Sequence, residues 1–87
     1  MNQSILFQDD YQFIVDENAV LIKAQQSGLL IECLVDANYL SSLSSDKQTS
    51  QDSIQLAIQY RFDIEDSLEE LIEEEAFSDD GKIYLGK

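Results

Sequence analysis

The first half of the chain predicts short β-strands, because apolar residues occur in brief runs separated by polar residues. Residues 4–8 and 11–15 form two such runs, with two aspartates between them. Residues 19–24 and 29–35 form two longer runs, which flank the polar tetrad Gln25-Gln26-Ser27-Gly28. Two apolar runs joined by a short polar segment that ends in Gly indicate an antiparallel β-hairpin.

The second run of this hairpin differs on its two faces, since alternate side chains of a strand point to opposite sides. One face is apolar throughout (Leu29, Ile31, Cys33 and Val35). The other face carries Glu32 between Leu30 and Leu34, so it is not cleanly polar. We therefore expect part of this second face to be covered by a helix end or by another subunit.

The second half of the chain predicts helices. Asp36 is a residue type that is preferred at the N-cap position of a helix. We therefore expect a short helix over residues 37–44, followed by a polar loop over residues 44–50. The segment Thr49-Ser50-Gln51-Asp52 offers a capping-box-like start, and a long amphipathic helix is expected to follow it. Its apolar stripe recurs at spacings of three and four (Ile54, Ala57, Ile58, Arg61, Ile64, Leu68, Leu71 and Ile72). The chain has no proline, so no residue is expected to break this helix.

A last strand over residues 82–85 follows Gly81 and gives the order βββ(β)ααβ. With 87 residues, the chain is long enough for a single domain, residues 1–87. We expect a two-layer α+β fold, in which one short and one long helix cover an antiparallel sheet. That sheet is built from the N-terminal hairpin strands plus the C-terminal strand. The expected core residues are Leu6, Phe13, Val20, Ile22, Ile31, Cys33, Val35, Leu40, Ile58, Ile64, Leu68, Ile72 and Ile83.

The strongly acidic composition limits the possible functions of the protein. The chain has 18 acidic and 5 basic residues, and its formal net charge is −13. Ten acids and no base lie between Asp63 and Asp80. Direct binding to nucleic acid or to an anionic membrane needs a basic surface, so we expect neither. An acidic surface can instead steer a basic protein by long-range attraction.

The outer side of the long helix collects much of this charge (Asp63, Asp66, Glu70, Glu73 and Glu74). Like charges four residues apart each cost about 0.2–0.5 kcal/mol, and carboxylates in the last turn oppose the helix dipole. Packing of the apolar stripe must therefore hold the helix. The carboxylates are then either tolerated as a solvated surface or kept for a basic partner.

Arg61 is the sole base between Lys47 and Lys82, and it falls on the apolar stripe. We expect its guanidinium to pair with Glu65 or Glu32, or else to bind an anion or a partner. The candidate partner-binding residues are Arg61, Asp66, Glu70, Glu73 and Glu74.

Few side chains suited to catalysis are present, since the chain has no histidine and one cysteine. A disulfide within the chain, a Cys/His zinc site and a histidine-based triad are excluded. Cys33 is expected to be a buried small hydrophobe. When Gly81 is set at the sixth position of a calcium loop, Ala76 and Lys87 occupy the first and twelfth positions, which need carboxylates. We expect Asp79-Asp80-Gly81 to be a turn, and we expect no metal site, no cofactor and no enzyme activity.

The start of the chain has no basic segment followed by a long apolar one, and no apolar run is long enough to span a membrane. We therefore expect a cytoplasmic protein, present as a monomer or a weak homodimer.

Several segments resemble the YrdB-like family of small gammaproteobacterial proteins, a domain of unknown function. These are the opening MNQSILF, AVLIKAQQSGLLIEC with Gly28 and Cys33, RFDIEDSLEELIEEE with Arg61, and the closing DDGKIYL with Gly81. The chain departs from this family at Phe13-Ile14, where members often have Trp-Asp, and at Tyr60-Arg61-Phe62, where they often have His-Arg-Trp. The resemblance implies a compact α+β domain with a hairpin and a long helix, and it implies no activity.

Two functions remain open at this point. The first is a small non-catalytic acidic interaction module that binds a basic protein. The alternative is a regulatory domain that responds to a small ligand or to a divalent metal ion.

Overall fold

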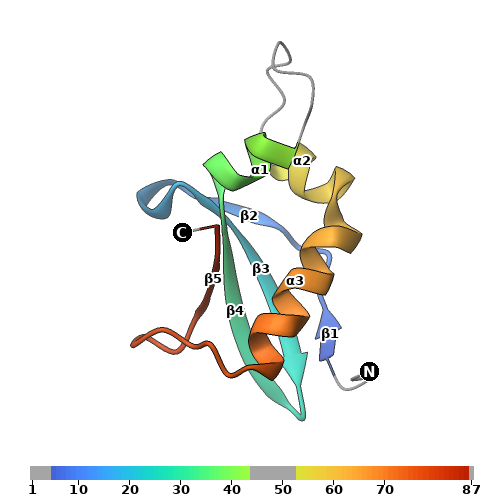
Figure 1. The fold of residues 1–87 in the computed structure, drawn as a ribbon, viewed down its shortest axis with the longest axis vertical. Coiled ribbons are helices and arrows are strands. Elements are labelled where there is room, and N and C mark those ends of the chain that lie inside the picture. Colours follow the sequence, from blue (N-terminus) through green and yellow to red (C-terminus); the bar gives the residue numbers. More distant parts are fainter. Residues whose placement is uncertain (1–4, 44–52, 87) are drawn as a thin grey trace.

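The computed structural model describes residues 5–43 and 53–86, which form an α+β fold of one sheet and one layer of helices (Figure 1). The strands are β1 (Ile5–Phe7), β2 (Gln12–Ile14), β3 (Ala19–Gln26), β4 (Leu29–Asp36) and β5 (Ile83–Leu85). The helices are α1 (Ala37–Leu43), α2 (Ser53–Gln59) and α3 (Arg61–Glu73), and a 3-10 turn, η1 (Val15–Glu17), joins β2 to β3. The two-layer α+β prediction is confirmed. The predicted loop at residues 44–50 and the predicted capping-box-like start at residues 49–52 lie outside the described residues.

The hairpin of β3 and β4 is the centre of the sheet, and it confirms the predicted pairing. The two strands pair antiparallel from Ala19↔Asp36 to Gln26↔Leu29, so β3 runs two residues into the polar tetrad while β4 begins at Leu29, as predicted. Ser27 and Gly28 alone form the turn, with φ angles of 54° and 82°. Two left-handed residues in succession are typical of the two-residue turn whose twist matches that of paired strands.

The other strands lie on either side of this hairpin. β1 and β2 both pair antiparallel with β3, one after the other along the same edge. β5 pairs with β4 and runs parallel to it, with Cys33 opposite Ile83. The prediction that the C-terminal strand completes an antiparallel sheet is therefore wrong, and the sheet is mixed. In Figure 1, α3 returns the chain to the hairpin end before β5 begins, and such a helical crossover is what a parallel pair requires.

The helices confirm one prediction and correct another. α1 begins after Asp36, whose Oδ2 accepts a hydrogen bond from the Asn38 N–H at 3.0 Å, so the predicted cap is present. The predicted single long helix is wrong, because it is interrupted at Tyr60, where φ is −107° and ψ is 25°. No proline or glycine causes this break. α2 contacts β2 and β3 whereas α3 contacts β5, so the bend lets the two helices cover different parts of the sheet.

The break at Tyr60 also changes which residues are buried. α2 buries Leu56 and Ala57, and α3 buries Ile64, Leu68 and Ile72. Ile58, predicted to lie in the core, is 48% exposed because the stripe does not continue through the bend.

The main core lies between the helices and one face of the sheet. Ten of the expected core residues are buried there: Val20, Ile22, Ile31, Cys33, Val35, Leu40, Ile64, Leu68, Ile72 and Ile83. Besides Ile58, the expectation was wrong for Leu6 and Phe13, which are exposed. The register of β1 turns Ile5 to the core and Leu6 to the opposite face, and Phe13 belongs to a three-residue strand at the sheet edge.

The opposite face of the sheet carries a smaller apolar cluster. Ala19, Leu21 and Leu34 are buried there, with Ile14 and Tyr84 packed against them. The apolar neighbours of this cluster thus come from β2 and β5 rather than from a helix end, and cover by another subunit stays a prediction. Among residues 5–43 and 53–86, no helix has the length and apolar character needed to cross a membrane.

Candidate functional site

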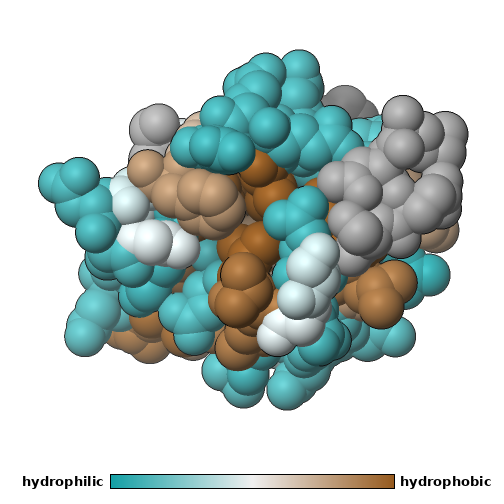
Figure 2. All heavy atoms as spheres, turned by 90° about the horizontal axis from the view of Figure 1, so that it is seen from below, coloured by the Kyte–Doolittle hydropathy of each residue, from teal (hydrophilic) through white to brown (hydrophobic). Residues whose placement is uncertain are grey.

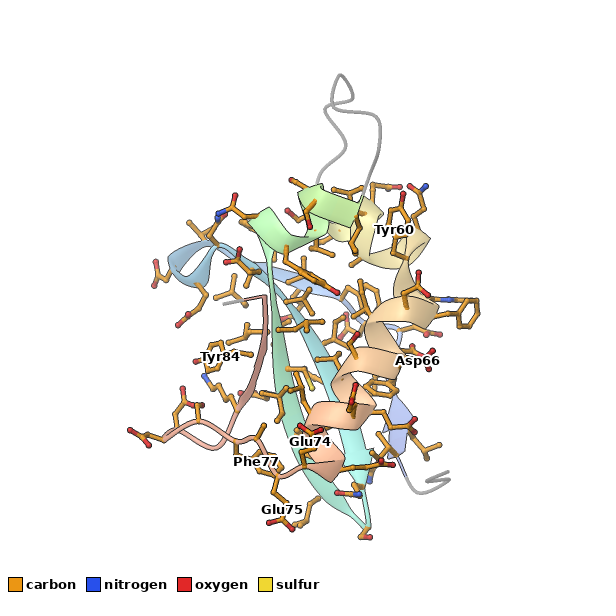
Figure 3. All side chains as sticks on the ribbon, in the orientation of Figure 1. Tyr60, Asp66, Glu74, Glu75, Phe77 and Tyr84 are labelled. Atoms are coloured by element: carbon orange, nitrogen blue, oxygen red, sulfur yellow. The ribbon has the colours of Figure 1, made fainter. Side chains whose placement is uncertain are left out.

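The outer side of α3 is a row of exposed carboxylates. Asp66, Glu70, Glu73 and Glu74 are all exposed, while Ile64, Leu68 and Ile72 on the opposite side are buried. Spacings of three and four residues place the four carboxylates on one side of the helix, as predicted. Figure 3 shows Asp66 and Glu74 toward opposite ends of this row. The last turn of α3 has no basic residue, so no local cation compensates the helix dipole there.

Arg61 lies apart from most of this row, at the first residue of α3. It is exposed rather than packed on the apolar stripe, because the helix is interrupted just before it. Its guanidinium carbon lies 5.0 Å from the centroid of the Phe62 ring. The expected pairing with Glu32 is wrong, since the Glu32 carboxylate lies 3.8 Å from Lys82 Nζ.

Glu65 is the other partner expected for Arg61. Burial raises the pKa of Glu65, and the nearby charge of Arg61 lowers it in part.

About 18 Å of helix separates Arg61 from Glu73, at 1.5 Å per residue. The structure therefore gathers the four predicted carboxylates on one surface and leaves Arg61 at its end.

The C-terminal end of α3 has an unusual residue at a conformationally demanding position. The Ala76 N–H donates to the Leu71 carbonyl and the Glu75 N–H donates to the Ile72 carbonyl, both at 3.0 Å. This pair of bonds is the Schellman motif, in which the residue after the cap adopts a left-handed conformation and is usually Gly. Here that residue is Glu75, with φ of 57°. A side chain at this position costs about 1 kcal/mol or more.

Replacing Glu75 by Gly is therefore expected to raise the free energy of unfolding by about 0.5–1 kcal/mol, since Gly adopts the left-handed conformation freely. Glu74 is the matched control, because its φ of −82° is right-handed. The same change there removes a helix-compatible side chain and is expected to destabilise by about 0.5–1 kcal/mol. Urea denaturation of both variants checks the pair. Two changes of the same sign and size would contradict the assigned helix end.

Next to this helix end, the surface is hollowed between α3, the hairpin turn and the segment that follows α3. The hollow has a volume of about 540 Å³. It is lined by Gln26, Leu29, Leu30, Ile31, Ile72, Glu73, Glu75, Phe77 and Gly81. Figure 2, which views the molecule from the hairpin end, shows apolar surface at the centre with hydrophilic atoms around it. We refer to this feature as the hairpin-end hollow.

Sequence reasoning missed the hairpin-end hollow, although it contains three of the large apolar side chains that remain exposed. Leu29 is 70% exposed, Leu30 is 57% exposed and Phe77 is 41% exposed. Figure 3 shows Phe77 and Glu75 together on the segment after α3, near the hairpin end. The available signal was Phe77 itself, a lone aromatic residue within a strongly acidic segment.

The Asp79-Asp80-Gly81 segment forms a turn, as expected. The Gly81 N–H donates to the Ser78 carbonyl at 2.9 Å, and Gly81 has a positive φ of 80°. The Asp80 carboxylate accepts hydrogen bonds from the Ser78 hydroxyl, from the Lys82 N–H at 3.3 Å and from the Tyr84 hydroxyl at 2.9 Å. Within residues 5–43 and 53–86, no three His, Cys, Asp or Glu residues are grouped so as to hold a metal ion.

These hydrogen bonds, first from Ser78 and then from Tyr84, lower the pKa of Asp80 from its ordinary value of 3.8. A lowered pKa means that the ionised carboxylate favours the folded state. This contribution is present above the ordinary pKa and is lost as the pH falls through the lowered one. An NMR titration of the Asp80 carboxyl carbon is expected to give a midpoint below 3.8, and Ser78→Ala should raise it. An unchanged midpoint in Ser78→Ala would show that the Ser78 bond does not stabilise the carboxylate.

Cys33 is buried in the main core and is not bonded to another cysteine. Burial raises the pKa of its thiol to about 12. The thiol is therefore protonated at neutral pH, and the expectation of a buried hydrophobe is confirmed.

Comparison with known proteins places the chain in a family. Residues 5–85 match the family described as "Protein of unknown function (DUF1488)". A crystal structure of a DUF1488 protein of unknown function from Shewanella loihica PV-4 is 39% identical, with a TM-score of 0.88. The match covers 100% of this chain and 97% of the other. No curated protein matches. The YrdB-like name and a gammaproteobacterial origin stay predictions, but membership of a family of unknown function is confirmed: this chain belongs to the DUF1488 family.

Proposed function

We propose that this protein is a small non-catalytic interaction module whose acidic α3 surface binds a basic protein. The observation that carries the proposal is the row of exposed carboxylates on α3, with no base in the last turn of the helix. A row of this kind weakens its own helix through like-charge repulsion, whereas a partner with Lys and Arg at matching positions relieves the repulsion. A net charge of −13 adds long-range attraction for such a partner.

The same charge supports two further parts of the proposal. The partner is a protein rather than nucleic acid or a membrane, since phosphate groups would be repelled. The protein is a monomer or a weak homodimer, because two copies would bring like charges together. We also propose that it acts in the cytoplasm. The alternative of a metal-responsive domain is less well supported, because the Asp80 carboxylate is used within its own turn.

A capture experiment tests this proposal with three versions of the protein. The first is wild type, the second carries Glu70→Gln, Glu73→Gln and Glu74→Gln, and the third carries Asp10→Asn, Asp16→Asn and Asp79→Asn. The two variants lose the same number of negative charges, and all six positions are exposed. Each protein is immobilised on a resin and incubated with native lysate, once at low salt and once at high salt. The captured proteins are then identified by mass spectrometry.

We expect wild type and the Asp variant to capture the same basic protein at low salt and to release it at high salt. The Glu variant is expected to capture much less of it. Equal capture by the Glu variant and wild type would overturn the proposal, as would a captured partner that is neutral or acidic.

A further inference from the structure

The hairpin-end hollow combines features that the acidic row alone does not have. Its floor contains Ile31 and Ile72, which are buried members of the main core, and its walls include the exposed side chains of Leu29 and Phe77. Large apolar side chains gathered around a concave surface, with a polar rim, mark binding sites more often than flat apolar patches do. A volume of about 540 Å³ suits one or two large side chains rather than a whole domain face.

The charge around the hollow indicates which kind of ligand can bind there. Glu73 and Glu75 belong to its lining, and none of its lining residues in the described part of the chain is basic. An acidic segment would be repelled there, and a second copy of this chain would bring further carboxylates against the rim. A ligand that is apolar where it enters the hollow and cationic where it passes the rim complements both features.

Glu73 connects the hollow to the acidic row, because it belongs to both. A bound segment can therefore leave the hollow past Glu73 and continue along Glu70 toward Asp66. The backbone conformation of Glu75 is a separate indication that the carboxylates at the rim have a functional role. Glu75 occupies a left-handed position where Gly would be less strained, and strained residues are often retained at functional sites.

We infer that the hairpin-end hollow binds a short linear segment of the basic partner, in which a large apolar side chain is flanked by Lys or Arg. The apolar side chain enters between Leu29, Ile72 and Phe77, and the neighbouring cations pair with Glu73 and Glu75. This inference rests on the proposed function and adds to it the place and the sequence type of the contact.

A selection experiment tests the inference and does not require the partner to be identified first. A random library of about ten-residue peptides is selected on the folded full chain at low salt, and enriched peptides are titrated into ¹⁵N-labelled protein. We expect enriched peptides to contain Leu, Ile, Phe or Trp within a few positions of Lys or Arg. We expect amide shifts to concentrate at Leu29, Leu30, Phe77 and Gly81.

Two matched variants separate the apolar from the charged contribution. Phe77→Ser removes an exposed apolar side chain, so the fold is retained, and is expected to weaken the selected peptide about tenfold. Glu73→Gln with Glu75→Gln is expected to weaken it by a similar factor at low salt and to have little effect at high salt. Asp10→Asn with Asp16→Asn, at exposed positions outside the hollow, is the control and should leave the affinity unchanged.

The outcomes distinguish this inference from the proposed function. Basic peptides that shift only Asp66 and Glu70 would overturn the inference and leave the proposed function standing. Enrichment of acidic or neutral peptides would overturn both. Failure to enrich any peptide would overturn the inference, and so would hollow amides that shift with protein concentration alone, since a second copy would then occupy the site. In those two cases the capture experiment still decides the proposed function.

Discussion

Replacing Leu68 by Ala is expected to lower the free energy of unfolding by about 2–5 kcal/mol, the usual cost of truncating a fully buried leucine. Leu68 lies in the middle of α3 and belongs to the main core cluster between the helices and the sheet. A domain of this size has a total stability of only several kcal/mol, so this single change should leave a large unfolded fraction near room temperature.

Ile58→Ala is the control that makes this result informative. A single straight helix would place Ile58 and Leu68 on the same apolar stripe, with similar costs of truncation. Because the helix is interrupted at Tyr60, Ile58 is 48% exposed, and Ile58→Ala should cost less than about 1 kcal/mol. Urea denaturation measures both values. Equal costs for the two variants would contradict the break between α2 and α3.

The second large effect concerns the acidic row itself. Changing Glu70, Glu73 and Glu74 together to Gln is expected to raise the free energy of unfolding by about 1–2 kcal/mol and to weaken partner binding about tenfold. The gain in stability comes from removing like-charge pairs with Asp66 and Glu69 and from relieving the helix dipole in the last turn. The loss of binding comes from removing the charges that pair with the partner.

The gain in stability together with the loss of binding distinguishes a functional row of carboxylates from a row that is only solvated. A merely solvated row predicts the gain in stability without any loss of binding. Asp10, Asp16 and Asp79 changed together to Asn provide the control for net charge, because these exposed residues lie outside α3. Thermal denaturation and calorimetric titration of the partner measure the two effects on the same samples. A triple Gln variant that binds normally would leave the carboxylates without a functional role.

Local sequence signals predicted the parts of the fold that depend on neighbours in the chain. The β3–β4 hairpin followed from its tetrad ending in Gly28, and α1 followed from the cap at Asp36. The interruption at Tyr60 could not be predicted, because no helix-breaking residue marks it and local propensity does not encode the different tertiary contacts of α2 and α3. The parallel direction of β5 depends on the path of α3, which periodicity does not specify.

The candidate site also has one part that the sequence predicts and one part that only the tertiary structure shows. Helical periodicity alone is enough to place Asp66, Glu70, Glu73 and Glu74 on one surface. The hairpin-end hollow joins Leu29 and Leu30 to Phe77 and Gly81, which are nearly fifty residues away in the sequence. No local pattern links those positions, so tertiary structure was needed to show that apolar and acidic residues meet there.

The salt dependence of partner affinity tests the central claim most directly. The dissociation constant of the captured partner is measured from about 50 to about 500 mM NaCl, for wild type and for the triple Gln variant. The account predicts that wild-type affinity falls steeply as salt rises and that the Gln variant, weaker at low salt, shows a much shallower dependence. Parallel salt dependences for the two proteins, or a wild-type affinity that salt does not change, would contradict binding through the acidic surface of α3.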